Sequence, residues 1–321
     1  MKAIVQTGYG SPDVLELRDV ELPVIGDDGV LVRVSASSVN AQDWHLLRGQ
    51  PRIARLMPGF GLRRPQRAVP GADVAGVVEA VGKNVTELRP GDEVFGARSG
   101  AFAEYVAGRV PNFAPKPANL SFEQAASMPV AAITALQALR DHGHVEAGQR
   151  VLILGAGGGV GSFAVQLATA FGATVTAVTT THKLEMVHSI GADEAIDHTR
   201  DDVTRSGRRF DVILDVGGYA SLPLLNRSLA PGGTAVLVGA GNVARVAARL
   251  VAAKVRSRLL GQRLIFFLAH ITRDDLLVLA DLAAAGKIVP VIDRTYPLRE
   301  APEAVRYFGT GQAGGKVVIT V

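Results

Sequence analysis

One stretch of the sequence, residues 150–183, restricts the possible folds more than any other. It reads RVLILGAGGGVGSFAVQLATAFGATVTAVTTTHK, in which five glycines within seven residues follow an unbroken apolar run. Such a run is typical of a strand that is covered on both faces of a parallel sheet. The next apolar residues recur at helical spacing, and Gly172 can end the helix. The stretch therefore predicts a strand, a glycine turn, an amphipathic helix and a second strand at 174–178.

The glycine turn predicts a dinucleotide-binding site. Without side chains, backbone N–H groups can approach a pyrophosphate at the positive end of the following helix. The spacing departs from G-x-G-x-x-G, because Val160 stands at the third glycine position counted from Gly155. A tight turn without a ligand is the alternative, but the strands and the helix around it favour the binding site.

The composition is that of a globular chain. Its 321 residues suffice for two domains or one large one, and 48% of them are hydrophobic. The absence of cysteine excludes disulfides and thiolate metal ligands. The N-terminus lacks the apolar segment of a signal peptide, so we expect a cytoplasmic location. Residues 151–181 carry no charge, but their periodicity changes twice, which argues against a membrane span.

The net charge of +4 favours anionic ligands, and cofactor phosphates satisfy that preference. We expect no nucleic-acid partner, because the basic residues are scattered and no nucleic-acid motif accompanies them. Residues 242–261 predict a basic amphipathic helix. Membrane or partner binding by this helix is possible but not expected, because a solvated surface helix is the commoner outcome.

The N-terminal part, residues 1–124, has the pattern of an all-β domain. Short apolar runs at 30–34, 74–81 and 93–95 are separated by glycine and proline turns. The long loop at 50–70 is either a binding loop or a surface excursion. Next, 121–139 predicts a helix pair, with Ser121 and Gln124 spaced as a capping box and Pro129 between the helices.

The part after residue 183 completes a doubly wound α/β sheet. A helix at 184–190 and strands at 210–215 and 234–238 are expected, and ligands bind at the carboxyl ends of such strands. The remaining elements are strands at 263–269, 289–292 and 316–321 and a helix at 274–285.

Five segments in combination resemble the medium-chain dehydrogenase/reductase superfamily: PGADVAGVVEAVG (70–82), RPGDEVFG (89–96), GAGGGVG (155–161), GADEAID (191–197) and LAPGG (229–233). Within it, the chain is most similar to the zinc-independent quinone oxidoreductases. Its ending, residues 285–321, resembles the branch of mitochondrial reticulon-interacting quinone reductases and plant enone reductases. The resemblance implies a β-rich GroES-like catalytic domain from 1–124 and 270–321, with a Rossmann domain at 125–269 between its two parts.

The resemblance also implies the chemistry. The zinc ligands of related alcohol dehydrogenases match Asn40, Ala72 and Val130, so no metal site is expected. Hydride transfer from NADPH to a small electrophile, a quinone or an α,β-unsaturated carbonyl, then becomes the expected reaction. A zinc-free alcohol or aldehyde reductase of the same fold and a non-catalytic NADPH-binding sensor are the alternatives.

The site residues follow from the same resemblance. Asn40, Asp43 and Thr134 are expected near the nicotinamide, although Asp43 fits a structural role equally well. His45 stands where many quinone reductases have a tyrosine, and it is either a proton donor or a packing residue. The expected cofactor-binding residues are Ala156, Gly158, Gly159, Val160, Gly161, Thr180, Lys183, His198, Val216, Gly217, Gly239, Ala240 and Lys316.

NADPH is expected in preference to NADH, because the segment between Thr174 and Leu184 lacks the acid that usually binds the ribose hydroxyls of NAD. Lys183 can instead bind a 2′-phosphate through charge-assisted hydrogen bonds, and a solvated helix start is the alternative for this lysine. A homodimer is also expected, because the resemblance implies that two sheets pair through the apolar strand at 263–269.

Overall fold

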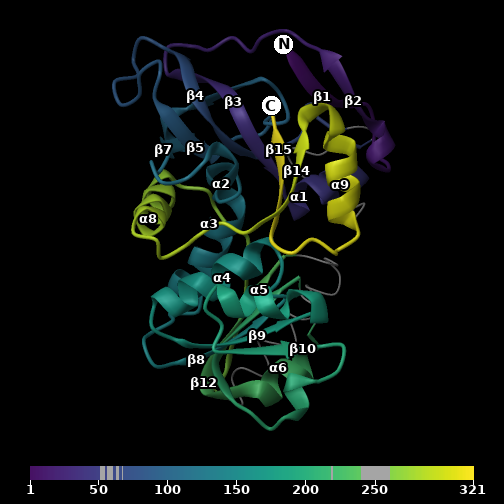
Figure 1. The fold of residues 1–321 in the computed structure, drawn as a ribbon, viewed down its shortest axis with the longest axis vertical. Coiled ribbons are helices and arrows are strands. Elements are labelled where there is room, and N and C mark those ends of the chain that lie inside the picture. Colours follow the sequence, from purple (N-terminus) through teal and green to yellow (C-terminus); the bar gives the residue numbers. More distant parts are fainter. Residues whose placement is uncertain (51–54, 56–60, 63–64, 67, 218–219, 240–260) are drawn as a thin grey trace. The chain divides into compact units, whose positions relative to one another are not determined.

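The structure is a computed structural model that describes residues 1–321 except 51–54, 56–60, 63–64, 67, 218–219 and 240–260 (Figure 1). The chain divides into two compact units. Unit 1 comprises residues 1–131, 271–286 and 290–321, and unit 2 comprises residues 132–270 and 287–289. The first division falls at residue 131 and not at the expected 124. The reason is that helix α2 (Phe122–Ala126) packs on strands of unit 1.

Unit 2 is a doubly wound α/β domain. Its six-stranded sheet has the order β10-β9-β8-β11-β12-β13, and every paired strand runs parallel to its neighbour. The strand order reverses between β8 and β11, which is the place where open α/β sheets bind ligands. The strands are β8 (Arg150–Leu154), β9 (Thr174–Thr179), β10 (Glu194–Asp197), β11 (Phe210–Val216), β12 (Leu229–Val238) and β13 (Arg263–Phe267).

The core of unit 2 explains the uncharged stretch in the sequence. Val151, Leu152 and Ile153 of β8 are completely buried, as expected for a central strand that is covered on both faces. Helix α4 buries Phe163 and Leu167. Among the described helices, none combines the length and the apolar character that a bilayer crossing requires. The helices of this unit are α4 (Gly159–Ala170), α5 (Leu184–Ser189), α6 (Leu222–Ser228) and the π-helix η4 (Ala138–His142).

Unit 1 is built on a seven-stranded sheet of order β14-β15-β3-β4-β5-β7, in which β6 pairs with β3, and on the hairpin β1-β2. The last strand, β15, lies antiparallel to β3, so both ends of the chain contribute to this unit (Figure 1). The strands are β1 (Lys2–Gln6), β2 (Leu15–Asp19), β3 (Gly29–Val39), β4 (Asp73–Val81), β5 (Glu93–Ala97), β6 (Tyr105–Arg109), β7 (Phe113–Pro115), β14 (Ile292–Pro297) and β15 (Lys316–Thr320).

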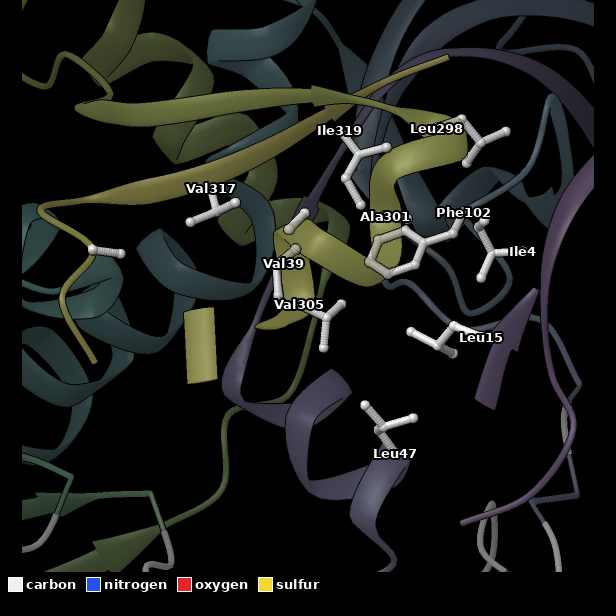
Figure 2. Close-up of a cluster of buried hydrophobic side chains, with 12 residues drawn as sticks. Ile4, Leu15, Val39, Leu47, Phe102, Leu298, Ala301, Val305, Val317 and Ile319 are labelled. Carbon is white, nitrogen blue, oxygen red and sulfur yellow. The ribbon is translucent and has the colours of Figure 1, made fainter. Parts of the chain in front are cut away.

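A buried apolar cluster joins the two chain ends within unit 1. Figure 2 shows the Phe102 ring among the side chains of Ile4, from the first strand, and Val305, from helix α9. Ile319 of β15 belongs to the same cluster and is completely buried. The helices of this unit are α1 (Ala41–Arg48), α2, α8 (Arg273–Ala284) and α9 (Ala301–Gly309), while α3 (Pro129–Gln137) spans the division between the units.

Most expected elements are present, and two expectations were wrong. Residues 41–48, placed in the all-β region, form helix α1, because Asp43 accepts the backbone N–H of Asn40 and Gly49 ends the helix at φ 56°. The strand expected at 289–292 begins only at Ile292, because Pro290 has no N–H for a strand ladder. The capping box of Ser121 and Gln124 is confirmed, with both reciprocal hydrogen bonds present. The basic helix expected at 242–261 lies outside the described residues.

Candidate functional site

The glycine turn of unit 2 is shaped by two contacts that only glycine permits. Gly155 has a φ of +82°, in the left-handed region. A Cβ on Gly161 would lie 2.2 Å from the Gly155 carbonyl oxygen and 2.6 Å from the Ala156 Cα. Helix α4 can therefore approach the turn only with glycine at 161. Position 161, one place later than in the usual fingerprint, provides the close packing of helix and strand.

The N-terminus of α4 faces away from this packed side. Gly158 is the N-cap residue and supplies no side chain to the first turn of the helix. The first N–H groups of a helix have no partner within it, and they carry the positive end of the dipole. Gly158, Gly159 and Val160 are all partly exposed. The turn thus suits a pyrophosphate, and its residues remain the predicted pyrophosphate contacts.

The loop after β9 contains the residues expected to bind a 2′-phosphate. Lys183 is only 7% exposed, and its Cδ lies 2.6 Å from the position that a Cβ on Gly157 would occupy. Its stem therefore packs over the glycine turn, which does not match a solvated helix start. Thr180 Oγ1 is buried without a hydrogen-bond partner among the described groups. A buried hydroxyl of this kind requires a partner, and a bound cofactor can supply one.

An acid that the sequence rule did not find lies next to this loop. Asp197 ends β10, and in the parallel pairing it lies opposite Thr179. Its carboxylate accepts hydrogen bonds from the Thr181 hydroxyl and from the N–H and hydroxyl of Thr199, at 2.9 and 2.7 Å for the latter two. These hydrogen bonds, led by the one from Thr181, lower the pKa of Asp197 to about 2. Asp197 lies outside residues 174–184 in the sequence, and only the pairing of β10 with β9 brings it beside this loop.

The ends of two other strands, β11 and β12, meet on the far side of the switch point. The Val216 carbonyl oxygen lies 2.9 Å from the position of a Cβ on Gly155. Gly217 donates its N–H to Val238, and both Gly217 and Gly239 have φ near +90°, at +99° and +82°. Ligand binding at the carboxyl ends of these strands stays a prediction. Ala240, the next predicted cofactor residue, lies outside the described residues.

Unit 1 contains a buried polar cluster at the end of its central strands. Asn40 follows β3, Asp73 opens β4 and Lys316 opens β15, and these three strands are neighbours in the sheet. All three side chains are buried, at 5%, 0% and 3% exposure respectively. Asp43 of α1 lies against them at 4% exposure. The structure thus brings together Asn40, Asp43 and Lys316, whereas Thr134 belongs to unit 2.

The charges around Asn40 determine the orientation of its amide. Its Oδ1 accepts a hydrogen bond from Lys316 Nζ at 2.6 Å, and its Nδ2 donates to Asp73 Oδ2 at 2.8 Å and to the Ser38 carbonyl at 3.4 Å. A flipped amide would place its NH₂ against the ammonium and its oxygen against the carboxylate. Both N–H groups are therefore used, and only a lone pair of Oδ1 remains.

Lys316, a predicted cofactor contact, has three acceptors within unit 1. Besides Asn40 Oδ1, its ammonium donates to the Val39 carbonyl at 3.2 Å and to Asp73 Oδ2 at 3.3 Å. An ammonium has three donors, so all of them have a protein acceptor in this arrangement. The geometry fits a lysine that holds Asn40 in place.

Burial changes the acidity of the groups in and near this cluster. It raises the pKa of Asp43 to about 7, and the Asp73 carboxylate adds to the effect, while the Asn40 N–H and the Lys316 ammonium oppose it. Burial likewise lowers the pKa of Lys316. His45, in the last turn of α1, is half-buried, and this burial lowers its pKa. At neutral pH its imidazole is therefore mainly uncharged.

Comparisons with known proteins cover both halves of the chain. Residues 26–118 match the alcohol dehydrogenase GroES-like domain family, and residues 190–319 match the zinc-binding dehydrogenase family. The chain is 36% identical to the 2-methylene-furan-3-one reductase of Solanum lycopersicum, over 99% of this chain and 79% of that protein. It is 35% identical to the mouse mitochondrial NAD(P)H oxidoreductase RTN4IP1, over 100% of this chain and 89% of that protein. The quinone oxidoreductase structure from Coxiella burnetii superposes with a TM-score of 0.88 at 29% sequence identity. The superposition covers 100% of this chain and 99% of that chain.

The zinc in the description of one matched family does not fit these residues. Of the three positions that the family resemblance matches to zinc ligands, Ala72 and Val130 have no donor atom in their side chains, and the Asn40 amide oxygen is bound to an ammonium. Within the described part of the chain, no group of three or more His, Asp or Glu residues could hold a metal ion.

Proposed function

The chain belongs to the medium-chain dehydrogenase/reductase superfamily, among the quinone oxidoreductases and alkenal/one oxidoreductases, and we propose that it transfers a hydride from NADPH to a quinone or an α,β-unsaturated carbonyl compound. Two of its relatives are an NAD(P)H oxidoreductase and an NADPH-dependent alkenal/one oxidoreductase, and the NADPH preference and the acceptor are the proposed parts. The observation that carries the proposal is the hydrogen bond from Lys316 to Asn40. Among the three positions matched to zinc ligands, only Asn40 has a side-chain donor atom for a metal, and the ammonium of Lys316 occupies it.

The nature of the acceptor follows from that observation. A simple aldehyde needs a Lewis acid or a strong hydrogen-bond donor to become reactive towards hydride, and a zinc ion commonly supplies this. Asn40 cannot replace it, because both of its N–H groups are bound to protein acceptors. Quinones and enones are already electron-poor, so they require the least polarisation. The names of two relatives, a 2-methylene-furan-3-one reductase and a quinone oxidoreductase, support this class of acceptor.

The residues of the chain divide the work of binding and orientation. The bound cofactor supplies the hydride from its dihydronicotinamide ring. The turn at 155–161 binds the pyrophosphate, and Thr180 and Lys183 bind the 2′-phosphate. Asn40 accepts one hydrogen bond, from a ribose hydroxyl or a carboxamide N–H, through the free lone pair of Oδ1. His45, mainly neutral at pH 7, has an imidazole N–H as its donor to the product.

A substrate panel tests this function. With NADPH in excess, kcat/KM is expected to be highest for quinones or enones and at least about tenfold lower for simple aldehydes, a difference of about 1.4 kcal/mol in activation free energy. Preference for aldehydes would support the alcohol or aldehyde reductase instead. Tight NADPH binding without turnover of any acceptor would support the sensor.

The cofactor preference has a separate test. Lys183→Ala removes a charge-assisted hydrogen bond and is expected to weaken NADPH binding by about tenfold to a hundredfold while leaving NADH nearly unchanged. Fluorescence titration of the cofactor-free protein measures both affinities. An equal loss for the two cofactors would contradict the proposed 2′-phosphate site. The cytoplasmic location stays a prediction.

A further inference from the structure

We propose that Asp197 is a positioning residue for the 2′-phosphate site, which it holds together by linking two loops of unit 2. The inference rests on the proposed function, because the proposed function places the 2′-phosphate at Thr180 and Lys183. It adds a residue that touches neither cofactor nor substrate in the proposal and yet determines the choice between NADPH and NADH.

The carboxylate of Asp197 uses one oxygen for each loop. Oδ2 accepts the hydrogen bond from Thr181, which lies in the loop after β9 between Thr180 and Lys183. Oδ1 accepts both hydrogen bonds from Thr199, in the loop after β10. The side chain is 6% exposed, so water competes little with these contacts. Removing one of them leaves a buried polar atom without its partner.

The two linked loops carry the three residues predicted to bind the phosphate. Thr180 and Lys183 flank Thr181, and His198 directly follows Asp197 in the sequence. A backbone hydrogen bond from the His198 N–H to the Thr179 carbonyl, at 3.0 Å, joins the loops a second time. The Asp197 side chain therefore adds a side-chain link to the backbone contact between the ends of β9 and β10.

Two effects of the carboxylate on NADPH have opposite signs. Its negative charge repels a phosphate, which would make Asp197 unfavourable for NADPH. Its hydrogen bonds hold Thr181 and hence the loop, which makes Asp197 favourable. The first effect is reduced because three donors surround the carboxylate and the Arg200 guanidinium lies 3.7 Å from Oδ2. Arg200 is 74% exposed, so its pairing is screened and the link to Thr181 is the dominant contribution.

The test is the pair of variants Asp197→Asn and Thr181→Val, titrated with NADPH and with NADH in the cofactor-free protein. Each is expected to weaken NADPH by about tenfold, the equivalent of one lost charge-assisted hydrogen bond, and to change NADH by less than about twofold. The double variant is expected to lose no more than either single one, because both remove the same link. Thr181→Val leaves the charge of Asp197 in place, so it separates the link from the electrostatic effect.

Asp211→Asn is the matched control. Asp211 also accepts a backbone N–H, from Arg150 at 2.8 Å, and pairs with its guanidinium at 3.7 Å, but it lies at the amino end of β11. Its replacement is expected to leave both affinities unchanged. Thermal unfolding of every variant shows whether it is folded. If Asp197→Asn does not fold, Thr181→Val alone tests the inference.

Three outcomes overturn the inference. If Asp197→Asn strengthens NADPH binding, the repulsion outweighs the link. If Asp197→Asn and Thr181→Val leave the ratio of the two affinities unchanged while Lys183→Ala changes it, Asp197 has no positioning role although the phosphate site is correct. If Lys183→Ala also leaves the ratio unchanged, the 2′-phosphate does not bind at this loop, and the proposed cofactor preference fails together with the inference.

Discussion

The side chain of Asn40 has a single hydrogen-bonding function left for a ligand. Lys316 occupies one lone pair of Oδ1, and Asp73 and Ser38 occupy the two N–H groups, so the amide can only accept. An acceptor at this position can orient a ribose hydroxyl or a carboxamide, but it cannot stabilise an oxyanion. In the proposed reaction, the donor that stabilises a developing enolate or phenolate must therefore come from another group, and His45 is the candidate within unit 1.

The buried charge pair of Lys316 and Asp73 holds Asn40 in place, and it predicts how strongly the loss of Lys316 would destabilise the fold. Lys316→Met leaves the Asp73 carboxylate buried without its cation, which is expected to lower the free energy of unfolding by about 3 to 5 kcal/mol. Urea unfolding measures this change. The double variant Lys316→Met/Asp73→Asn is expected to recover part of the loss. Lys83→Met is the control, because that lysine is 74% exposed and its pair with Asp27 contributes at most about 1 kcal/mol.

The raised pKa of Asp43 predicts an unusual pH dependence. An unfolded aspartate loses its proton near pH 3.8, whereas in the folded chain Asp43 keeps it up to about pH 7. Between these values the folded state binds more protons, so this group makes stability fall as pH rises, and above pH 7 its contribution is constant. The full difference is on the order of 4 kcal/mol.

Urea unfolding of the wild type and of Asp43→Asn between pH 4 and 8 isolates this contribution. The stability of the wild type relative to the variant is expected to decline across that window, because asparagine has no proton to lose. Other carboxylates, such as Asp197 with its lowered pKa, have the opposite slope, but they are common to both proteins. Parallel profiles for the two proteins would show that Asp43 is ionised in the folded state throughout.

At the scale of elements, local patterns in the sequence were sufficient to predict helices and strands. The contacts between strands that are distant in the sequence could not be predicted from these patterns. The strand, turn and helix at 150–170 follow from apolar periodicity and glycines, both of which are local signals. Asp73 was not identified, because its partners Ser38, Asn40 and Lys316 come from other strands. The Asn40-x-x-Asp43 capping pattern could have predicted helix α1. The helix was not predicted because the surrounding sequence has the pattern of an all-β domain.

The glycine turn allows a paired test of element packing. Gly161→Ala would place a methyl group 2.2 Å from the Gly155 carbonyl oxygen, so helix α4 must move away from β8. We expect a loss of about 3 kcal/mol in unfolding free energy, and a lower Tm. Gly158→Ala is the control, since its methyl group would meet only the Gly155 oxygen, at 3.6 Å. Equal Tm values for the two variants would contradict the assignment of the close contact to position 161.

At the scale of the whole molecule, β13 is the last strand of the unit 2 sheet in the part of the chain that the structure describes. β13 pairs with β12, and no described strand pairs with its other edge. Leu264 and Phe266 pack on the core of the unit, while Ile265 between them is half-buried. An apolar edge strand with unpaired backbone groups tends to pair with another chain. A two-fold axis at this edge would join the sheets of two copies.

We propose on this basis that the protein is a homodimer that pairs through β13. A charged residue at position 265 tests this interface. Ile265→Lys is expected to shift the protein to a monomer in sedimentation at micromolar concentration, because a charged side chain on an edge strand opposes further pairing. Val24→Lys is the control, since Val24 is 94% exposed in unit 1 and its replacement should leave the assembly unchanged. A wild-type protein that sediments as a monomer with full activity would contradict the dimer. A dimer that survives Ile265→Lys would place the interface on another surface. Loss of the dimer is also expected to reduce Tm at low protein concentration, where mass action favours separate chains.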